Sequence, residues 1–541
     1  MNKPKPAIIH VPYLLGGYEF GRHLPFYLLA WILLACHLLL ELSTVVQTSS
    51  SSYWASGEYI VGIWLLISAI AMKALCLAIV LCAGPFLATE ALLGVGSPLQ
   101  SAWNVRIQSA AEVVTTAEAP EHRSQEHRPP SDGKPQLADI RSAKATECLE
   151  IIATKKITSK DLVNALTKEE SRARPNQRLL VGFGINNCFT TTDPADCKAF
   201  RDIVEKLIYI DDDQWKKLAV YVQRVAQDEL ATPATLTLFI VVQELAMKAV
   251  IYRLFDRDTH KKELDSSIRD LADEINQQWV RSKGQYDPGT QPTWAFENSP
   301  RLQAVLKTVF SDYVMEDSEN NPLNLILPGY ETLWRVVLRC FIELTARSHD
   351  DASSWCASLQ KFVNDPNITQ LDDVAKVGVC ATNISQEALR VYPPTRRIYR
   401  EYETGDGETY QAATDIESLH RGTATWGLDA ALFRPERWNG KFDNKDAQDR
   451  VFMPFGAKPF ACPAKRRPGL ERLPFGVSMI ALLVGVLTAE TEGKWKLVGK
   501  LPRDGEPLGT DREAYGDLML ERIPDEAALP TERDDADELV R

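Results

Sequence analysis

The stretch that decides the interpretation of this chain is FGAKPFACPA, residues Phe455–Ala464. A Phe-Gly turn leads to a single cysteine, Cys462, and a long apolar stretch follows, so we expect Cys462 to lie at the start of a helix. A buried structural cysteine is the simple alternative, since cysteine is among the most buried residue types. A cysteine on such a loop is also the arrangement that holds a thiolate against a heme iron, where the sulfur donates electron density to the metal.

Length and charge limit the classes of function. The 541 residues carry a formal net charge of −12, which argues against nucleic acid as the main partner. This length suffices for one large domain with appendages, or for two to three domains. The ten cysteines show no paired spacing typical of a zinc site or a disulfide framework. We therefore expect a chain that works in a reducing compartment.

Two apolar runs near the N-terminus, residues 24–42 and 59–93, are each long enough to cross a bilayer as a helix. Lysine and arginine residues precede the first run, whereas the segment 43–58 between the runs contains neither. The positive-inside rule therefore predicts a hairpin of two transmembrane helices, with the remainder of the chain in the cytosol. A single span formed by the second run is the alternative within this interpretation, and buried core helices are the alternative without a membrane.

Composition divides the chain into four parts: a membrane anchor with one or two transmembrane helices at 1–95, a flexible linker at 96–136, a catalytic body at 137–524 and an acidic tail at 525–541. Most periodic segments of the body have helical spacing. Short extended segments are expected near Arg397–Tyr402 and Thr409–Ala413. The body is therefore predicted to be mainly α with small β-sheets.

Two further motifs predict a buried ion network. Glu387 and Arg390 are spaced to share one face of a helix, which the following Pro393-Pro394 cannot continue. Taken alone, this spacing is common among solvated surface pairs. Arg437 lies among aromatic residues and a proline, where a simple surface role fits poorly. It would complete a network with Glu387 and Arg390, because an unpaired buried charge is expensive.

The fourth motif, Leu327–Thr332, lies inside the apolar segment 323–344. Pro328 and Gly329 weaken the hydrogen-bond ladder of a helix and favour a kink. Glu331 and Thr332 follow at once, and an acid and an alcohol beside a kink suit the delivery of protons. An ordinary kinked helix is the alternative for this motif taken alone.

In this order and spacing the four motifs resemble the cytochrome P450 family of heme-thiolate monooxygenases, over about Asp193 to Pro502. The resemblance implies a cytochrome P450 fold preceded by transmembrane helices, and a heme b cofactor (iron protoporphyrin IX) with a cysteine thiolate ligand. The chain looks most like the membrane-bound microsomal type found in fungi, with the catalytic domain facing the cytosol from the endoplasmic reticulum. The implied reaction is oxidation, in particular hydroxylation, of an apolar small molecule such as a secondary-metabolite intermediate. Oxygen and electrons from NADPH would be used, delivered by NADPH–cytochrome P450 reductase with or without cytochrome b5.

The resemblance assigns roles around the cofactor. Cys462 would be the iron ligand, Phe455 would pack under the heme and shield the sulfur, and Gly456 would let the loop turn tightly. Arg400 falls where the family often places a cation against a heme propionate. Gly329 would leave room for dioxygen.

Five more residues receive roles away from the iron ligand. Glu331 and Thr332 would form the acid–alcohol pair on the distal helix. Glu387, Arg390 and Arg437 would form the salt-bridged network that holds the heme-binding core.

The chain also departs from the family pattern. Phe460 stands where the cysteine loop usually has a basic residue, so one propionate partner is missing. Arg400 or a residue near Lys198 or Arg201 would have to substitute for it. The early body has no Trp-x-x-x-Arg pattern, which leaves that heme contact unassigned. His420 falls in a stretch where many members place another propionate contact.

Two other functions fit parts of this pattern. A heme-thiolate isomerase or dehydratase would rearrange a peroxide without a reductase, and dependence on reductant separates it from a monooxygenase. A membrane-tethered, non-catalytic binding protein with a degenerate heme site would show no heme spectrum.

Overall fold

The computed structural model describes residues 138–524, except 284–291, 314–317, 348, 375–377, 443–444, 466–471 and 510–513. The chain divides into two units, Met1–Pro130 and Ser131–Arg541, and all described residues belong to the second. The predicted anchor at 1–95, the linker at 96–136 and the tail at 525–541 lie outside the described residues. Within the described ranges, no helix combines the length and the apolar character needed to cross a membrane.

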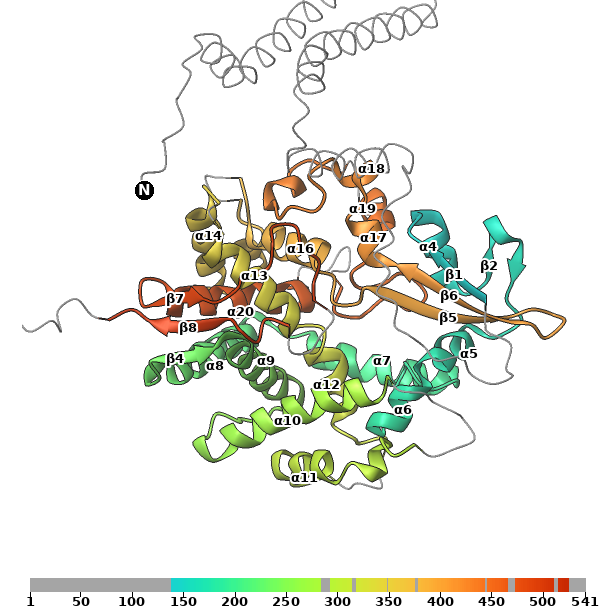
Figure 1. Ribbon diagram of the computed structural model, residues 1–541, viewed down its shortest axis with the longest axis horizontal. Helices are drawn as coiled ribbons and strands as arrows, with labels where there is room; N and C mark the ends of the chain where they lie inside the picture. The colour runs from blue at the N-terminus through green and yellow to red at the C-terminus, as the bar shows by residue number, and fades with distance from the viewer. Residues whose placement is uncertain are drawn as a thin grey trace, which may run out of the picture. The chain divides into compact units, whose positions relative to one another are not determined.

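Helices form most of the described chain (Figure 1). In chain order they are α4 (Ala145–Ala153), α5 (Lys168–Ala173), α6 (Gln177–Phe183), α7 (Pro194–Ile208), α8 (Asp212–Ala231), α9 (Leu238–Phe255), α10 (Lys262–Arg281), α11 (Pro300–Val309), α12 (Leu323–Tyr330), α13 (Trp334–Ala346), α14 (Ala352–Asn364), α15 (Ile368–Leu371), α16 (Ala381–Val391), α17 (Ile416–His420), α18 (Thr423–Trp426), α19 (Lys445–Val451) and α20 (Phe475–Thr491).

The strands form three small sheets. The hairpin of β5 (Arg397–Glu403) and β6 (Thr409–Asp415) pairs Arg400 with Ala412, and β1 (Ala138–Ser142) adds to β6 in parallel. The other sheets are the pair β2 (Lys156–Ile157) and β3 (Leu162–Val163), and the three-stranded sheet of β4 (Thr235–Thr237), β8 (Met519–Arg522) and β7 (Trp495–Val498). The prediction of a mainly α body with short strands near 397–402 and 409–413 is confirmed.

Local sequence signals set the start of the long helices. At the start of α8, the Asp211 side chain accepts a hydrogen bond from the Gln214 N–H at 2.8 Å, and the Gln214 side chain accepts from the Asp211 N–H at 3.1 Å. This reciprocal pair satisfies two backbone donors that a helix otherwise leaves without partners. At α7, Asp193 caps the helix and Pro194 follows at its first position, where a missing N–H does no harm.

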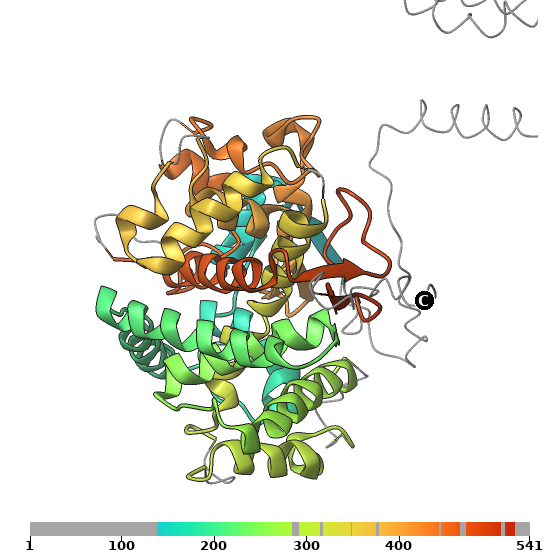
Figure 2. The same cartoon turned by 90° about the vertical axis from the view of Figure 1, so that its left-hand side faces the viewer.

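Helix α20 is the centre of the core. Its sequence, FGVSMIALLVGVLTAET, is apolar around its whole circumference, which is typical of a helix buried on all sides. It runs between α13, α14 and α16 on one side and α8 on the other (Figures 1 and 2). Gly485 permits the approach of α14, because a Cβ there would lie 2.7 Å from Val363 Cγ2.

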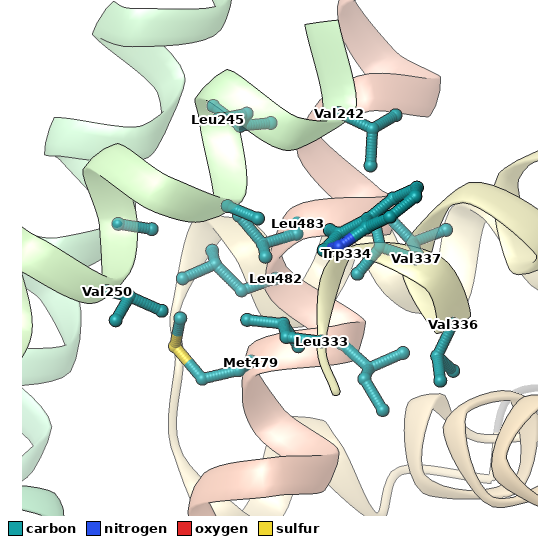
Figure 3. Packing of buried hydrophobic residues seen from close by; sticks show 14 of the residues in the cluster. Val242, Leu245, Val250, Leu333, Trp334, Val336, Val337, Met479, Leu482 and Leu483 are labelled. Atoms are coloured by element: carbon teal, nitrogen blue, oxygen red, sulfur yellow. The ribbon is translucent and has the colours of Figure 1, made fainter. Parts of the chain in front are cut away.

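Side chains from three helices interdigitate around α20. Figure 3 shows Met479, Leu482 and Leu483 of α20 facing α9 and the first turn of α13. Leu333 lies just before α13 and Trp334 is its first residue, and both are buried in this cluster. The core therefore fixes the residues that follow the Leu327–Thr332 motif against the helix that follows the cysteine loop.

The apolar segment 323–344 is two helices rather than one kinked helix. Helix α12 ends at Tyr330, and α13 begins at Trp334 after a turn at 331–333. Pro328 lies inside α12, where it cannot donate to the carbonyl four residues earlier, and α12 continues past it to Tyr330. The predicted interruption is present, and it is a complete break that places Glu331 and Thr332 in the turn.

Candidate functional site

Backbone hydrogen bonds hold the cysteine loop in a tight fold. The Gly456 N–H donates to the Met453 carbonyl at 3.0 Å, and the Cys462 N–H donates to the Phe455 carbonyl at 2.9 Å. Gly456 has φ of +65°, a conformation that residues with a side chain rarely adopt. The Cys462 side chain at the end of this loop is exposed. The loop therefore presents a sulfur atom from a backbone fixed on both sides of it.

Cys462 does not lie at the start of a helix, and this expectation is wrong. Residues 463–465 form a turn, and α20 begins only at Phe475. The loop is nevertheless attached to that helix, since the Gly476 N–H donates to the Ala464 carbonyl at 3.1 Å. Phe455 packs against the same point, because a Cβ added to Gly476 would lie 2.6 Å from Phe455 Cε1. The glycine lets the loop approach the helix closely.

Although the Cys462 side chain reaches the surface of the loop, desolvation by the surrounding protein is the largest influence on the pKa of its thiol and raises it, so the proton is held more tightly. The Ala464 N–H and the charge of Arg201 act in the opposite direction. A metal ion bound to the sulfur would displace that proton, because thiols coordinate as thiolates.

Arg390 is completely buried, and acceptors satisfy all of its hydrogen-bond donors. Its Nε and Nη2 donate to the two Glu387 carboxylate oxygens at 2.8 and 2.7 Å. The remaining donors reach the carbonyls of His420 at 2.8 Å, Ala430 at 2.6 Å and Leu432 at 3.1 Å. A guanidinium has five N–H groups, so this arrangement leaves none without a partner.

Glu387 is the centre of the network. Besides Arg390, it accepts from the Arg434 N–H at 2.9 Å, from Trp438 Nε1 at 3.0 Å and from Arg437 Nε at 3.4 Å. Arg437 is also held by Asp429 at 2.9 Å. The structure thus brings Glu387, Arg390 and Arg437 together from α16 and the segment 434–438.

His420 links this network to the cysteine loop. Its Nε2 accepts a hydrogen bond from the Met453 N–H at 2.8 Å, and its carbonyl accepts from Arg390. The ring is completely buried, and burial, followed by the charge of Arg390, lowers the pKa of His420 to about 3. Nε2 of His420 therefore positions Met453, whose carbonyl accepts from Gly456, and the expected propionate contact at His420 stays a prediction.

Three arginines from separate elements converge on the loop just before Cys462. Arg172 of α5 lies over the Phe460 ring, 3.9 Å from its centroid, and Arg400 of β5 lies 5.4 Å from it. Arg201 of α7 donates to the Pro459 carbonyl at 3.0 Å. The folded chain therefore gathers positive charge at the loop position where the sequence has an aromatic residue.

Arg172 and Arg400 are both buried, and within the described ranges neither forms an ion pair with a carboxylate. Arg172 Nη2 donates to Cys197 Sγ at 3.0 Å and Arg400 Nη1 donates to the Tyr399 carbonyl at 2.7 Å, whereas the Nε of each has no hydrogen-bond partner. Desolvation, with the nearby charge of Arg172, lowers the pKa of Arg400 to about 9. Buried cations without a counter-ion are unfavourable, so this arrangement fits a bound anion.

The two polar residues at the helix break, Glu331 and Thr332, differ in their exposure to solvent. Thr332 is exposed, and its hydroxyl donates to the Pro328 carbonyl at 2.8 Å. Glu331 beside it is buried. The hydroxyl oxygen of Thr332 keeps its lone pairs for a further donor.

Gly329 packs against α9. A Cβ at this position would lie 3.3 Å from Val250 Cγ1 and 3.4 Å from Leu254 Cδ1. The missing side chain of Gly329 is therefore directed toward α9, and the role of this glycine in making room for dioxygen stays a prediction.

No family model matches the chain. It is 32% identical over 154 residues to cytochrome P450 71A19 of Arabidopsis thaliana, and 26% identical over 231 residues to the cytochrome P450 monooxygenase claQ of Ampulloclitocybe clavipes. These matches cover 26% and 37% of this chain. Over these stretches the chain is similar to proteins named as cytochrome P450s. It spans 28% and 42% of the length of these two P450 relatives.

A solved P450 structure was also compared. The crystal structure of CYP175A1 from Thermus thermophillus superposes with a TM-score of 0.47 at 14% identity, over 71% of this chain and 89% of that chain.

The described residues fit the heme cofactor of the cytochrome P450s that the chain resembles. A heme b carries one iron, which takes a cysteine thiolate, and two propionate carboxylates. Cys462 offers an exposed sulfur on a fixed loop, and Arg172, Arg201 and Arg400 offer cations beside that loop.

Sequence reasoning missed Arg172. It lies in α5, whose sequence KEESRA resembles a solvated surface helix, and no P450 motif includes it. Only the tertiary structure, which places α5 beside β5, makes it part of the site. Arg201 was one of the substitutes considered, and the structure brings it to the loop.

Proposed function

We propose that this chain is a heme-thiolate monooxygenase that hydroxylates an apolar small molecule. The observation that carries the proposal is the exposed sulfur of Cys462 on a loop that buried arginines surround. When bound, a thiolate-ligated heme supplies the activation of dioxygen for insertion into C–H bonds. The relationship to a fungal protein named as a monooxygenase supports this reaction.

The chain's own residues would hold the cofactor and control protons. Cys462 would bind the iron, and Phe455 and Gly456 would keep the loop in the shape that presents the sulfur. Glu387, Arg390 and Arg437 would act from a distance, through His420 and Met453, by fixing the backbone of that loop. None of the network residues would need to contact the substrate.

Thr332 and Glu331 would move protons. The Thr332 hydroxyl hydrogen is directed to the Pro328 carbonyl, so its oxygen can accept a hydrogen bond from a water or a hydroxyl group. Glu331, adjacent in the turn and buried, would replace the proton that leaves. The break between α12 and α13 would therefore serve as the proton entry to the distal side.

We also propose that the protein receives electrons from a redox partner and is attached to a membrane. Electrons would come from NADPH through NADPH–cytochrome P450 reductase, with or without cytochrome b5. The apolar runs at 24–42 and 59–93 support attachment to the endoplasmic reticulum with the catalytic body in the cytosol. Retention of the full chain in membranes after an alkaline carbonate wash is expected, and its release would contradict the anchor.

The most specific part of the proposal is the chemical class of the substrate. An apolar intermediate of secondary metabolism is supported by the resemblance to fungal members and by the expected position at a bilayer, where such compounds concentrate. The iron spin-state shift on binding would identify substrates in a screen of apolar compounds.

Labelling with isotopic oxygen tests the proposed monooxygenase activity. The full chain in membranes, with reductase and NADPH under 18O2, should place one labelled oxygen atom in the product. Conversion of a peroxide substrate without NADPH would instead support an isomerase or dehydratase. A protein that binds no heme under these conditions would refute both enzymes and favour a binding protein.

A further inference from the structure

The cysteine loop has an aromatic residue where a basic residue is usual, and arginines from other elements lie beside it. The loop carries an aromatic residue, Phe460, and three cations reach it from α5, α7 and β5. Arg172 is the closest of these to the ring. It also lies 6.0 Å from the Phe189 ring, so two aromatic side chains are near its guanidinium.

The positive charge of this cluster exceeds what the nearby protein groups neutralise. The Cys197 sulfur accepts from Arg172, and a hydrogen bond from Cys188 is the main cause that lowers the pKa of Cys197 to about 6. Even a fully ionised Cys197 would balance one cation, while Arg172 and Arg400 together carry two. The Nε groups of both arginines are buried without an acceptor. An anion of at least one negative charge is therefore needed.

We propose that Arg172 substitutes for the basic residue that the cysteine loop lacks, and that Arg172 and Arg400 form the carboxylate-binding site for the propionates of the heme. This inference rests on the proposed function, because it assumes that Cys462 binds the heme iron. The Phe460 ring supports the guanidinium of Arg172, which stacks on it. A guanidinium stacked on a ring keeps its N–H edge available for a carboxylate, whereas a loop arginine at 460 would repel Arg172.

Cys197 has the complementary task of orienting Arg172. It accepts one N–H of the guanidinium at 3.0 Å, and it is buried on α7. This bond takes one of five donors and leaves the others for a bidentate contact with a carboxylate. Cys197 and Arg201 lie on the same helix, so α7 positions one cation and contributes another.

The test compares four forms of the full chain. Arg172→Met removes the charge and keeps an apolar stem. The double variant R172M/F460R returns a cation to the loop. Arg178→Met is the matched control, since Arg178 stacks on Trp279 at 4.8 Å on the neighbouring helix α6. Each protein is loaded with heme and, separately, with heme dimethyl ester, in which both propionates are esterified.

The readout is the rate at which the bound heme transfers to excess apomyoglobin, with circular dichroism as the check on folding. Arg172→Met should release heme about tenfold faster than the wild type or more, as expected for loss of a charge-assisted hydrogen bond. With the dimethyl ester, this difference should disappear. The double variant should recover most of the heme retention.

Three results would overturn the inference. These are equal heme release by Arg172→Met and Arg178→Met, equally accelerated release of heme and its ester, or no recovery in R172M/F460R. Failure of the proposed function is distinguishable, because the wild-type protein would then lack a thiolate-ligated heme spectrum. A normal wild-type spectrum with any of the three results refutes the role of Arg172 alone.

Discussion

His420 makes the stability of the heme-binding core depend on pH. The folded protein needs the neutral ring, because Nε2 must accept from the Met453 N–H, and burial with the nearby charge of Arg390 lowers the pKa of His420 to about 3. In the unfolded chain the pKa of a histidine is about 6.5. Between these two values the unfolded state binds more protons than the folded state. The contribution of His420 to stability is therefore complete above about pH 6.5 and is lost as the pH falls toward 3.

The magnitude follows from these two pKa values. At about pH 5 an unfolded histidine is almost fully protonated and the folded one is not, so the loss is RT ln(1 + 10^1.5), or about 2 kcal/mol. At about pH 7.5 the same expression gives less than about 0.1 kcal/mol. His420→Gln places a non-titrating oxygen near the position of Nε2 and should remove this part of the pH dependence.

The assay is urea unfolding of the full chain at the two pH values, followed by tryptophan fluorescence. The difference in unfolding free energy between about pH 7.5 and pH 5 should be about 2 kcal/mol smaller in His420→Gln than in the wild type. The comparison of two proteins cancels the other groups that titrate. Equal pH dependence in both would refute the conclusion that the folded state holds His420 neutral.

Three further predictions address the network, the loop and the distal turn. Glu387→Gln should destabilise the protein by about 3–5 kcal/mol, because it leaves the buried charge of Arg390 without its counter-ion, and the full chain should purify with little heme, as measured by the pyridine hemochrome assay; normal heme content would contradict the network's role. Gly476→Ala should displace the Phe455 ring, since the added Cβ would lie 2.6 Å from Phe455 Cε1, and should lower the melting temperature and shift the heme absorbance, whereas an unchanged spectrum would show that the loop is not held there. Thr332→Ala should keep NADPH consumption but release hydrogen peroxide in place of product, and full coupling of NADPH to product would exclude Thr332 from proton delivery.

The sequence predicts the parts of the fold that depend on local pattern. The strands at 397–403 and 409–415 are expected from the sequence as short extended segments, and α8 and α9 follow from helical spacing. An interruption near Pro328 and Gly329 is expected from the sequence because both residues weaken the hydrogen-bond ladder of a helix. The extent of this break does not follow from the local pattern, because burial of Leu333 and Trp334 against α9 and α20 decides where α13 begins.

The candidate site shows the same division between local and tertiary information. Glu387, Arg390 and Arg437 could be grouped from the sequence, since Glu387 and Arg390 share one helix face and Arg437 lies among aromatic residues and a proline. Arg172 could not, because its helix has the composition of a surface helix and only the packing of α5 beside β5 brings it to Phe460. Gly329 was assigned by resemblance, and the direction of its missing side chain toward α9 can be known only from the structure.

The ligand of the iron is the central claim, and one spectrum tests it. The full-length wild-type protein and Cys462→His are reduced, exposed to carbon monoxide and compared by difference spectroscopy. The wild type should show the strongly red-shifted Soret band that a cysteine thiolate produces, and Cys462→His, if it retains heme, should show the unshifted band of an imidazole ligand. A red-shifted band that survives the substitution, or heme in the wild type without that band, would contradict ligation by Cys462.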